Sequence, residues 1–271
     1  MAAKRMCPNC RAFVEKMSGD CPYCGNPLGQ RAIDVRQPGE ILGGLIPQAH
    51  FTTILILMIN VGLYIATSLF ARTLGEGMSL YAFGGKLGRA IWQDHEYWRL
   101  ITAGFLHGGI LHIAMNSWVL YDLGAQVEEV FGTARFLCIY FVGTIGGFYL
   151  SARMNPGLSI GSSAGIMGLI GAMIAFGVMN RTSMGRQIRS FYVRWAVYGM
   201  AMGFLISGID NWAHIGGIVG GFAIAFVSGT PVRASRSSDS VWKVLAFFCV
   251  LLTVYSFYLA YRAFPTPDQL R

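Results

Sequence analysis

Residues 161–179 read GSSAGIMGLIGAMIAFGVM, an uncharged apolar run that opens on two serines. Small residues recur along this run at helical spacing, at Gly161, Gly165, Gly168, Ala172 and Ala175. A stripe of small residues lets a neighbouring backbone approach closely, which is a common way for helices to pack inside membranes. The stretch therefore predicts a membrane helix with a polar start.

The composition extends this prediction to the whole chain. Only 13% of the 271 residues are charged, whereas 54% are hydrophobic, and the mean hydropathy is +0.49. Soluble proteins have about 25% charged residues. A net charge of +8 could indicate nucleic-acid binding, but here the basic residues separate apolar runs instead of lining one face. We expect an all-α polytopic membrane protein with no nucleic-acid partner.

Seven apolar stretches are long enough, or nearly so, to cross about 30 Å of hydrocarbon. They are residues 52–71, 108–125, 135–154, 163–180, 190–208, 212–229 and 241–262. The long connection 72–105 contains Trp92, Tyr97 and Trp98, which suits a loop in the headgroup region. We expect His107 to be interfacial as well.

The basic residues orient these spans. With the N-terminus in the cytoplasm, most of the 21 Lys and Arg residues lie on the inner side, including Arg181, Arg186 and Arg189 before the fifth span. Cytoplasmic loops of membrane proteins carry such an excess of positive charge. We therefore expect a multi-pass protein of a prokaryotic inner (cell) membrane, with a cytoplasmic N-terminus and an extracytoplasmic C-terminus.

The first thirty residues differ from the rest of the chain because they hold four of the six cysteines, at Cys7, Cys10, Cys21 and Cys24. Two CxxC pairs about ten residues apart can supply four thiolates to one tetrahedral Zn²⁺. The segment 11–20 has room for a short return strand. A pair of disulfides is the alternative, but the cytoplasmic side is reducing and favours the metal.

The domain organisation follows from these features. We expect a structural zinc ribbon over residues 1–30, a polar linker over 31–50, a transmembrane domain of seven spans over 51–264 and a short tail over 265–271. The ribbon is too short to build an apolar core, so the metal would supply most of its folding energy. Its partner is left open.

Four polar side chains interrupt the apolar spans, and polar groups at such positions mark functional sites. His112 and Asn116 are four residues apart and share one face of the second span. Ser163 opens the fourth span, and His214 lies near the start of the sixth. In the expected orientation all four lie at a similar shallow depth below the outer surface. The sixth span also has two overlapping GxxxG pairs, Gly216/Gly220 and Gly217/Gly221, which we expect to bring it close to the fourth.

Taken together in this order, the motifs resemble those of the rhomboid family of intramembrane serine proteases over about residues 95–229. The motifs are Tyr97-Trp98-Arg99, His112-x-x-x-Asn116, Glu128-x-x-x-Gly132-x-x-Arg135, Gly161-x-Ser163 and Ala213-His214-x-Gly216-Gly217. The resemblance implies a bundle of six core transmembrane helices, here with one additional C-terminal helix.

The resemblance also implies a serine endopeptidase that cuts transmembrane segments of single-span or polytopic substrates near the extracytoplasmic face. Ser163 would be the nucleophile and His214 the general base. His112, Asn116 and the backbone N–H of Ser163 would form the oxyanion hole. Catalysis would need no cofactor, and the span 190–208 would form the lateral gate in the bilayer.

One departure from the family pattern concerns the residue four positions after the nucleophile. The family commonly has an aromatic there, packed against the catalytic histidine, and this chain has Met167. A thioether can fill such a place, although less rigidly. The alternative function is a catalytically silent rhomboid-like protein that binds membrane clients without cutting them. A small-solute transporter would need paired Gly/Pro-interrupted spans in related halves, which the sequence lacks.

Overall fold

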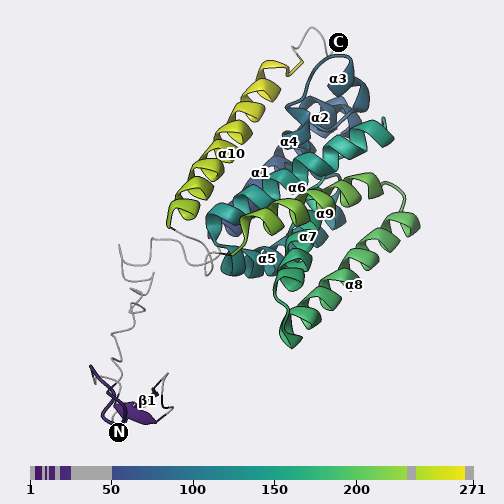
Figure 1. Cartoon of the computed structure of the whole chain (residues 1–271). Coiled ribbons are helices and arrows are strands. Elements are labelled where there is room, and N and C mark those ends of the chain that lie inside the picture. The colour runs from purple at the N-terminus through teal and green to yellow at the C-terminus, as the bar shows by residue number, and fades with distance from the viewer. Residues whose placement is uncertain are drawn as a thin grey trace. The chain divides into compact units, whose positions relative to one another are not determined.

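A computed structural model describes residues 4–7, 10, 12–15, 19–25, 51–230 and 236–265. The expected linker 31–50 and nearly all of the expected tail lie outside these described residues. The chain divides into two compact units, Met1–Gln48 and Ala49–Arg271 (Figure 1). Each unit is described by itself.

The first unit contains a small antiparallel hairpin around the first pair of cysteines. Strand β1 (Lys4–Met6) pairs with β2 (Phe13–Glu15), with Arg5 opposite Val14. The amide of Cys7 donates to the carbonyl of Ala12 at 2.9 Å and closes the turn between the strands. The expected return strand is thus β2, and its partner precedes the first CxxC pair.

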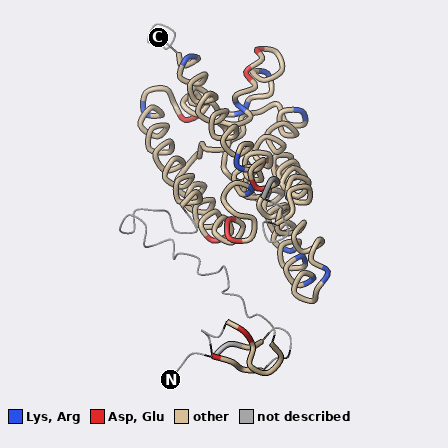
Figure 2. The backbone as a smooth tube through the Cα atoms, turned by 60° about the vertical axis from the view of Figure 1, so that its left-hand side comes forward, with Lys and Arg blue, Asp and Glu red and all other residues tan. Residues whose placement is uncertain are grey.

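The second unit is a bundle of long helices at the positions of the seven apolar stretches. They are α1 (Phe51–Leu74), α5 (Ile110–Phe131), α6 (Thr133–Met154), α7 (Ser163–Met179), α8 (Ser183–Leu205), α9 (Asn211–Ser228) and α10 (Arg236–Arg262). Figure 2 shows charged residues mainly near the ends of these helices, with long uncharged stretches between them.

The connection between α1 and α5 is folded and not extended. It contains α2 (Glu76–Ala82), α3 (Gly88–Trp92), α4 (Arg99–Thr102) and the 3-10 turn η2 (Ala103–Phe105). Its Arg99 is only 2% exposed and donates to the carbonyls of Tyr81 at 2.6 Å and Gly85 at 3.0 Å. Arg99 therefore organises the interior of this connection.

Four described helices are long and apolar enough to cross a membrane: Phe51–Leu74, Thr133–Met154, Asn211–Ser228 and Ser238–Arg262. Helix α7 is apolar but shorter. Helices α5 and α8 carry charged residues, among them Asp122 and Arg189. In the windows that define the first and last of these four spans only 17% of residues are buried, so α1 and α10 have large apolar surfaces that suit contact with lipid.

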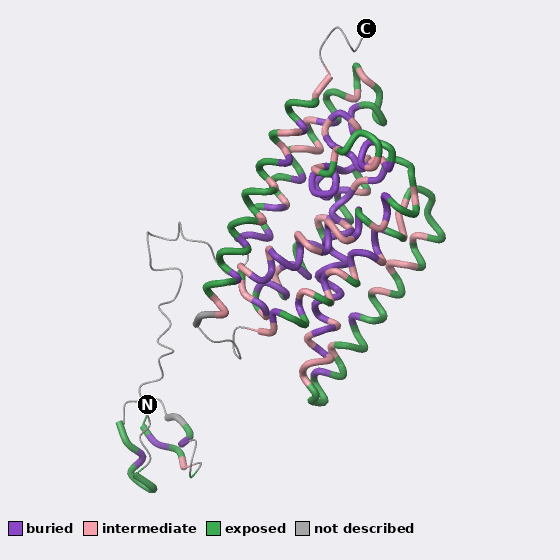
Figure 3. Tube along the Cα trace, turned by 45° about the horizontal axis from the view of Figure 1, so that its top comes forward, coloured by how far each residue is buried: buried purple, intermediate pink, exposed green. Residues whose placement is uncertain are grey.

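Helix α7 is the centre of the bundle, and most of its residues are buried, as Figure 3 shows by colour. A Cβ atom on Gly217 of α9 would collide with the carbonyl oxygen of Ala164, and one on Gly221 would collide with the backbone of Gly168. These glycines therefore permit the close approach of α9 to α7.

The other GxxxG pair of α9 has a different partner. Cβ atoms on Gly216 and Gly220 would meet the backbone of α6, at the carbonyl oxygens of Gly146 and Val142. On α7, Gly165 faces the ring of Tyr140 of α6. The prediction that both pairs and the whole α7 stripe serve the α7–α9 contact was therefore too simple, because α6 fits against both helices.

The outer helices are fastened to this centre near the turn between α5 and α6. Glu128 accepts hydrogen bonds from the amide and hydroxyl of Thr53 in α1, at 3.3 and 3.1 Å. Arg135 forms an ion pair with Asp239 of α10 at 2.8 Å. The two charged residues of one sequence motif thus hold two different helices.

Candidate functional site

The polar start of α7 follows a short segment, residues 159–161, whose backbone is hydrogen-bonded to the connection between α1 and α5. Residues Lys86 and Ser159 exchange two backbone hydrogen bonds, and the amide of Gly161 donates to the carbonyl of Ala103 at 2.9 Å. Gly161 has φ of +126°, a conformation that residues with a side chain rarely adopt. The backbone therefore enters α7 at Ser163 through a turn that requires glycine.

The absence of a side chain at Gly161 brings His112 and Ser163 to one place. A Cβ atom there would lie 2.8 Å from Nε2 of His112 and 3.6 Å from Oγ of Ser163. The imidazole from α5 and the hydroxyl from α7 thus both lie beside Gly161. This arrangement joins two of the four residues that the sequence singled out.

Asn116 contacts the neighbouring serine. Its Oδ1 accepts from Oγ of Ser162 at 3.2 Å, and its Nδ2 donates to the carbonyl of His112 at 2.9 Å. Nε2 of His107 lies 3.2 Å from the same Ser162 hydroxyl. Ser162, which is fully buried, therefore joins the loop before α5, α5 itself and the start of α7.

His107, which we expected at the membrane interface, is buried inside the protein and only 1% exposed. The rings of His107 and His112 are in edge contact, with centroids 5.1 Å apart. His107 is thus a site residue that was not predicted. The available signal in the sequence was its short spacing from His112, on the other side of Gly108 and Gly109.

His214 lies one turn into α9 and is 5% exposed. Its Nδ1 is buried and has no hydrogen-bond partner among the described residues. The structure has no hydrogen bond between His214 and Ser163, which are both described. Their helices are nevertheless in close contact, since Gly217, three residues after His214, lies against the carbonyl of Ala164.

Asp210 fixes the start of α9. Its Oδ1 accepts from the amides of Trp212 and Ala213 at 3.1 and 3.2 Å, which caps the helix. Burial acts to raise the pKa of Asp210, but hydrogen bonds from Ser151 and Ser159 and the positive charge of Lys86 outweigh it and lower that pKa. Asp210 is therefore a charged cap.

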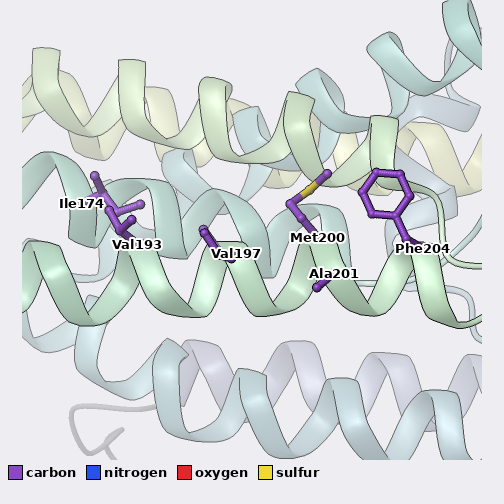
Figure 4. Close-up of a pocket in the computed structure, with 7 residues that line it drawn as sticks. Ile174, Val193, Val197, Met200, Ala201 and Phe204 are labelled. Atoms are coloured by element: carbon purple, nitrogen blue, oxygen red, sulfur yellow. The ribbon is translucent and has the colours of Figure 1, made fainter.

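Helix α8 borders the site on the side of Met167, whose methyl group lies against Gly199. Between α7 and α8 is an apolar groove of about 470 Å³. Figure 4 shows its lining, which is Ile174, Val193, Ala196, Val197, Met200, Ala201 and Phe204. The C-terminal end of α8 is exposed, with Phe204, which also lines the groove, at 81% and Leu205 at 78%.

A separate candidate metal centre lies in the first unit. The sulfur atoms of Cys7, Cys10, Cys21 and Cys24 all lie within 4.8 Å of one another, and none of the four cysteines forms a disulfide. In a tetrahedral zinc–thiolate site neighbouring sulfurs are about 3.8 Å apart, from a Zn–S bond of about 2.3 Å. The four cysteines therefore form a cluster that could bind a metal ion.

Comparison with known proteins agrees with this architecture. The rhomboid domain family model matches residues 94–231, which include α5 to α9. The chain is 39% identical over 153 residues to Rhomboid protease GluP of Bacillus subtilis (strain 168), covering 56% of this chain and 30% of that protein.

Two Arabidopsis thaliana proteins are also similar. RHOMBOID-like protein 6, mitochondrial, is 38% identical over 150 residues, covering 52% of this chain and 48% of that protein. Inactive RHOMBOID-like protein 8 is 34% identical over 144 residues, covering 52% of this chain and 41% of that protein. The chain thus matches less than half the length of each of these relatives. With a family model that covers half of its length, this integral membrane protein belongs to the rhomboid family.

Proposed function

We propose that the chain is an intramembrane serine endopeptidase that uses Ser163 and His214 to cleave transmembrane segments of membrane proteins near the extracytoplasmic face. The observation that carries the proposal is the closeness of His112 Nε2 and Ser163 Oγ, which both lie beside Gly161. A substrate carbonyl that reached Ser163 Oγ would also lie near the imidazole of His112. Membership of a family that includes intramembrane serine proteases supports the same chemistry.

In the proposed reaction Ser163 Oγ forms a bond to the scissile carbonyl carbon while His214 takes the hydroxyl proton. When the tetrahedral intermediate collapses, the C–N bond breaks and His214 protonates the leaving amine. A water molecule then attacks the acyl ester and gives a proton to His214, which returns it to Ser163 Oγ as the ester C–O bond breaks and the carboxylic acid product leaves. The free Nδ1 of the buried His214 supports an imidazole that has not committed both nitrogens to the fold.

The oxyanion would be stabilised by the backbone N–H of Ser163 and the side chains of His112 and Asn116. The hydrogen bond from Asn116 Nδ2 to the carbonyl of His112 uses one of two amide protons and leaves the other for an oxyanion. Donors that are fixed before charge develops cost no reorganisation, and loss of one costs about 3 kcal/mol of barrier stabilisation.

Substrates would be single-span or polytopic membrane proteins that enter from the bilayer past α8. The outer half of α8 is exposed and apolar. A transmembrane segment of a substrate can therefore replace lipid against this surface. A helical segment hides its carbonyls in backbone hydrogen bonds. Small or helix-breaking residues near the scissile bond should therefore favour cleavage.

We place the protein in a prokaryotic inner (cell) membrane with a cytoplasmic N-terminus and an extracytoplasmic C-terminus. The arginines of α8 near its start, including Arg186 and Arg189, support this orientation because positive charge accumulates on the cytoplasmic side. Residues 1–30 would then be a cytoplasmic zinc ribbon with Cys7, Cys10, Cys21 and Cys24 as ligands. The distances between the four sulfur atoms support a single metal ion bound by four thiolates.

Two assays on the full chain test the proposal. A serine-directed fluorophosphonate should label the protein in detergent, and a model single-span substrate should be cleaved in liposomes. Both signals should vanish in Ser163→Ala and persist in Ser190→Ala, which removes an exposed hydroxyl from α8.

Labelling that survives in Ser163→Ala would contradict the assigned nucleophile. Wild-type protein that is not labelled and cleaves none of a broad substrate panel, but is recovered in complex with uncut membrane proteins, would support a catalytically silent client-binding function. One relative with 34% identity is itself named inactive, and this is the observation that favours the client-binding alternative.

A further inference from the structure

Lys86 is a charged residue in the interior of the second unit. Its side chain is 0% exposed, although it belongs to the connection between α1 and α5. The ammonium donates to the carbonyl oxygens of Asn155 at 2.8 Å and Gly157 at 2.9 Å. Both carbonyls belong to the segment between α6 and α7, so the Lys86 side chain holds the chain that leads to Ser163.

The backbone of Lys86 holds the same segment a second time. Its amide donates to the carbonyl of Ser159 at 3.0 Å, and the amide of Ser159 donates back at 2.9 Å. Ser159 is four residues before Ser163. The path into α7 is therefore fixed at three successive points, Asn155, Gly157 and Ser159, by one residue.

The ammonium of Lys86 also reaches the start of α9. Its Nζ lies 3.8 Å from Oδ2 of Asp210. Asp210 caps α9 through Oδ1, and its backbone carbonyl accepts from the amide of His214 at 3.2 Å. The charge of Lys86 therefore acts on the turn of helix that carries His214.

We propose that Lys86 is a positioning residue for the catalytic dyad of Ser163 and His214. Its ammonium joins the segment before Ser163 to the helix turn before His214, and it thereby sets the separation of the Ser163 and His214 side chains. This inference rests on the proposed function. Neither residue of the dyad is joined to the other by a hydrogen bond in the structure, so their relative position depends on the backbones that carry them.

Burying the charged ammonium of Lys86 is energetically unfavourable. Burial lowers the pKa of Lys86 to about 8, although Asp210 acts in the opposite direction. Replacing a buried ion pair with apolar side chains is often neutral or stabilising. A charged lysine at this place is therefore better explained by the geometry it imposes than by stability.

The test compares fluorophosphonate labelling rates of full-length wild type and Lys86→Met in detergent. Methionine keeps much of the length of lysine and removes the charge and the donors. We expect labelling to slow about 100-fold, the loss typical of a displacement of about 1 Å in a catalytic site, with an unchanged thermal unfolding midpoint. Lys243→Met, which removes an exposed lysine from α10, should label like the wild type.

The pH dependence separates positioning from a merely structural role. Asp210 is the one ionisable side chain that contacts the Lys86 ammonium among the described residues. Once pH exceeds about 8 the amine is neutral and no longer attracts Asp210, so the rate advantage of wild type over Lys86→Met should shrink. Asp210→Asn keeps a capping oxygen but removes the charge, and it should slow labelling without this alkaline change.

The possible failures are distinguishable. A wild-type protein that is not labelled contradicts the proposed function and with it this inference. Labelled wild type together with folded Lys86→Met that reacts at the same rate overturns the inference alone. If Lys86→Met does not fold, Asp210→Asn decides, because wild-type labelling in that folded variant also overturns the inference.

Discussion

Asn116 of α5 and Ser162 of the turn into α7 share a buried hydrogen bond, with Oγ 3.2 Å from Oδ1. The proposed oxyanion donor is thus held by the residue beside the proposed nucleophile. The two consecutive serines consequently have different tasks. Ser163 Oγ lies beside Gly161, near Nε2 of His112, whereas the Ser162 hydroxyl contacts His107 and Asn116.

This division predicts unequal effects of two alanine substitutions. Ser162→Ala removes the partner of Asn116, and a lost buried hydrogen bond costs about 1–3 kcal/mol, so we expect labelling by fluorophosphonate to slow about tenfold. Ser163→Ala should abolish it. Labelling rates of the two purified variants check the prediction, and the reverse result would assign the nucleophile to Ser162.

Gly217→Ala should separate α9 from α7. The new Cβ would collide with the carbonyl oxygen of Ala164, and such overpacking costs about 1–3 kcal/mol. We expect a lower unfolding midpoint in detergent and a lower labelling rate. Gly62→Ala in α1 is the matched control because its Cβ would meet nothing within 4 Å. Equal behaviour of the two variants would contradict the packing account.

The buried lysine predicts an unusual dependence of stability on pH. The pKa of Lys86 is about 8 in the fold, below its ordinary value of 10.5, so the unfolded chain binds the proton more tightly. Its contribution to the free energy of unfolding should therefore increase as pH rises from about 8 to 10.5, by about 3 kcal/mol at most. Denaturant unfolding of wild type and Lys86→Met at several pH values measures the difference. A wild type that loses stability over this interval relative to the variant would refute the assignment.

Metal removal should affect the first unit and leave the second active. We expect one zinc per chain by elemental analysis, and we expect a chelator to release it and to remove amide exchange protection from residues 4–25. Fluorophosphonate labelling should continue at an unchanged rate. Cys21→Ser should lower the zinc content, whereas Cys249→Ser in α10 should not. Full zinc in the Cys21→Ser protein would exclude the four-thiolate site.

Local patterns in the sequence predicted much of the molecule. The apolar stretches became seven long helices, and the spacing of the four cysteines predicted one cluster. Those features depend on neighbours along the chain, through periodicity and short spacing. His112 and Ser163 were predicted to converge because both lie near the starts of helices that begin on the same side of the bundle, and in the structure both lie beside Gly161.

Features that depend on distant partners were not predictable. Nothing near Lys86 in the sequence indicates Asp210, because the two residues are far apart in the chain and meet only in the packed bundle. Likewise, Gly216 and Gly217 are adjacent in the chain but face α6 and α7 respectively. The sequence pattern shows that a helix has small faces, whereas the choice of partner for each face depends on the packed bundle.

The length of α7 has a consequence for the connection between α1 and α5. A helix of 17 residues is about 25 Å long, shorter than the roughly 30 Å of hydrocarbon. One end of α7 must stop within the oily layer, where bare peptide groups are very costly. In the segment that leads to Ser163, Ala103 and Lys86 provide partners for the peptide groups of Gly157, Ser159 and Gly161. The folded connection between α1 and α5 thus shields the backbone before α7 from the hydrocarbon, which allows a short helix to end there.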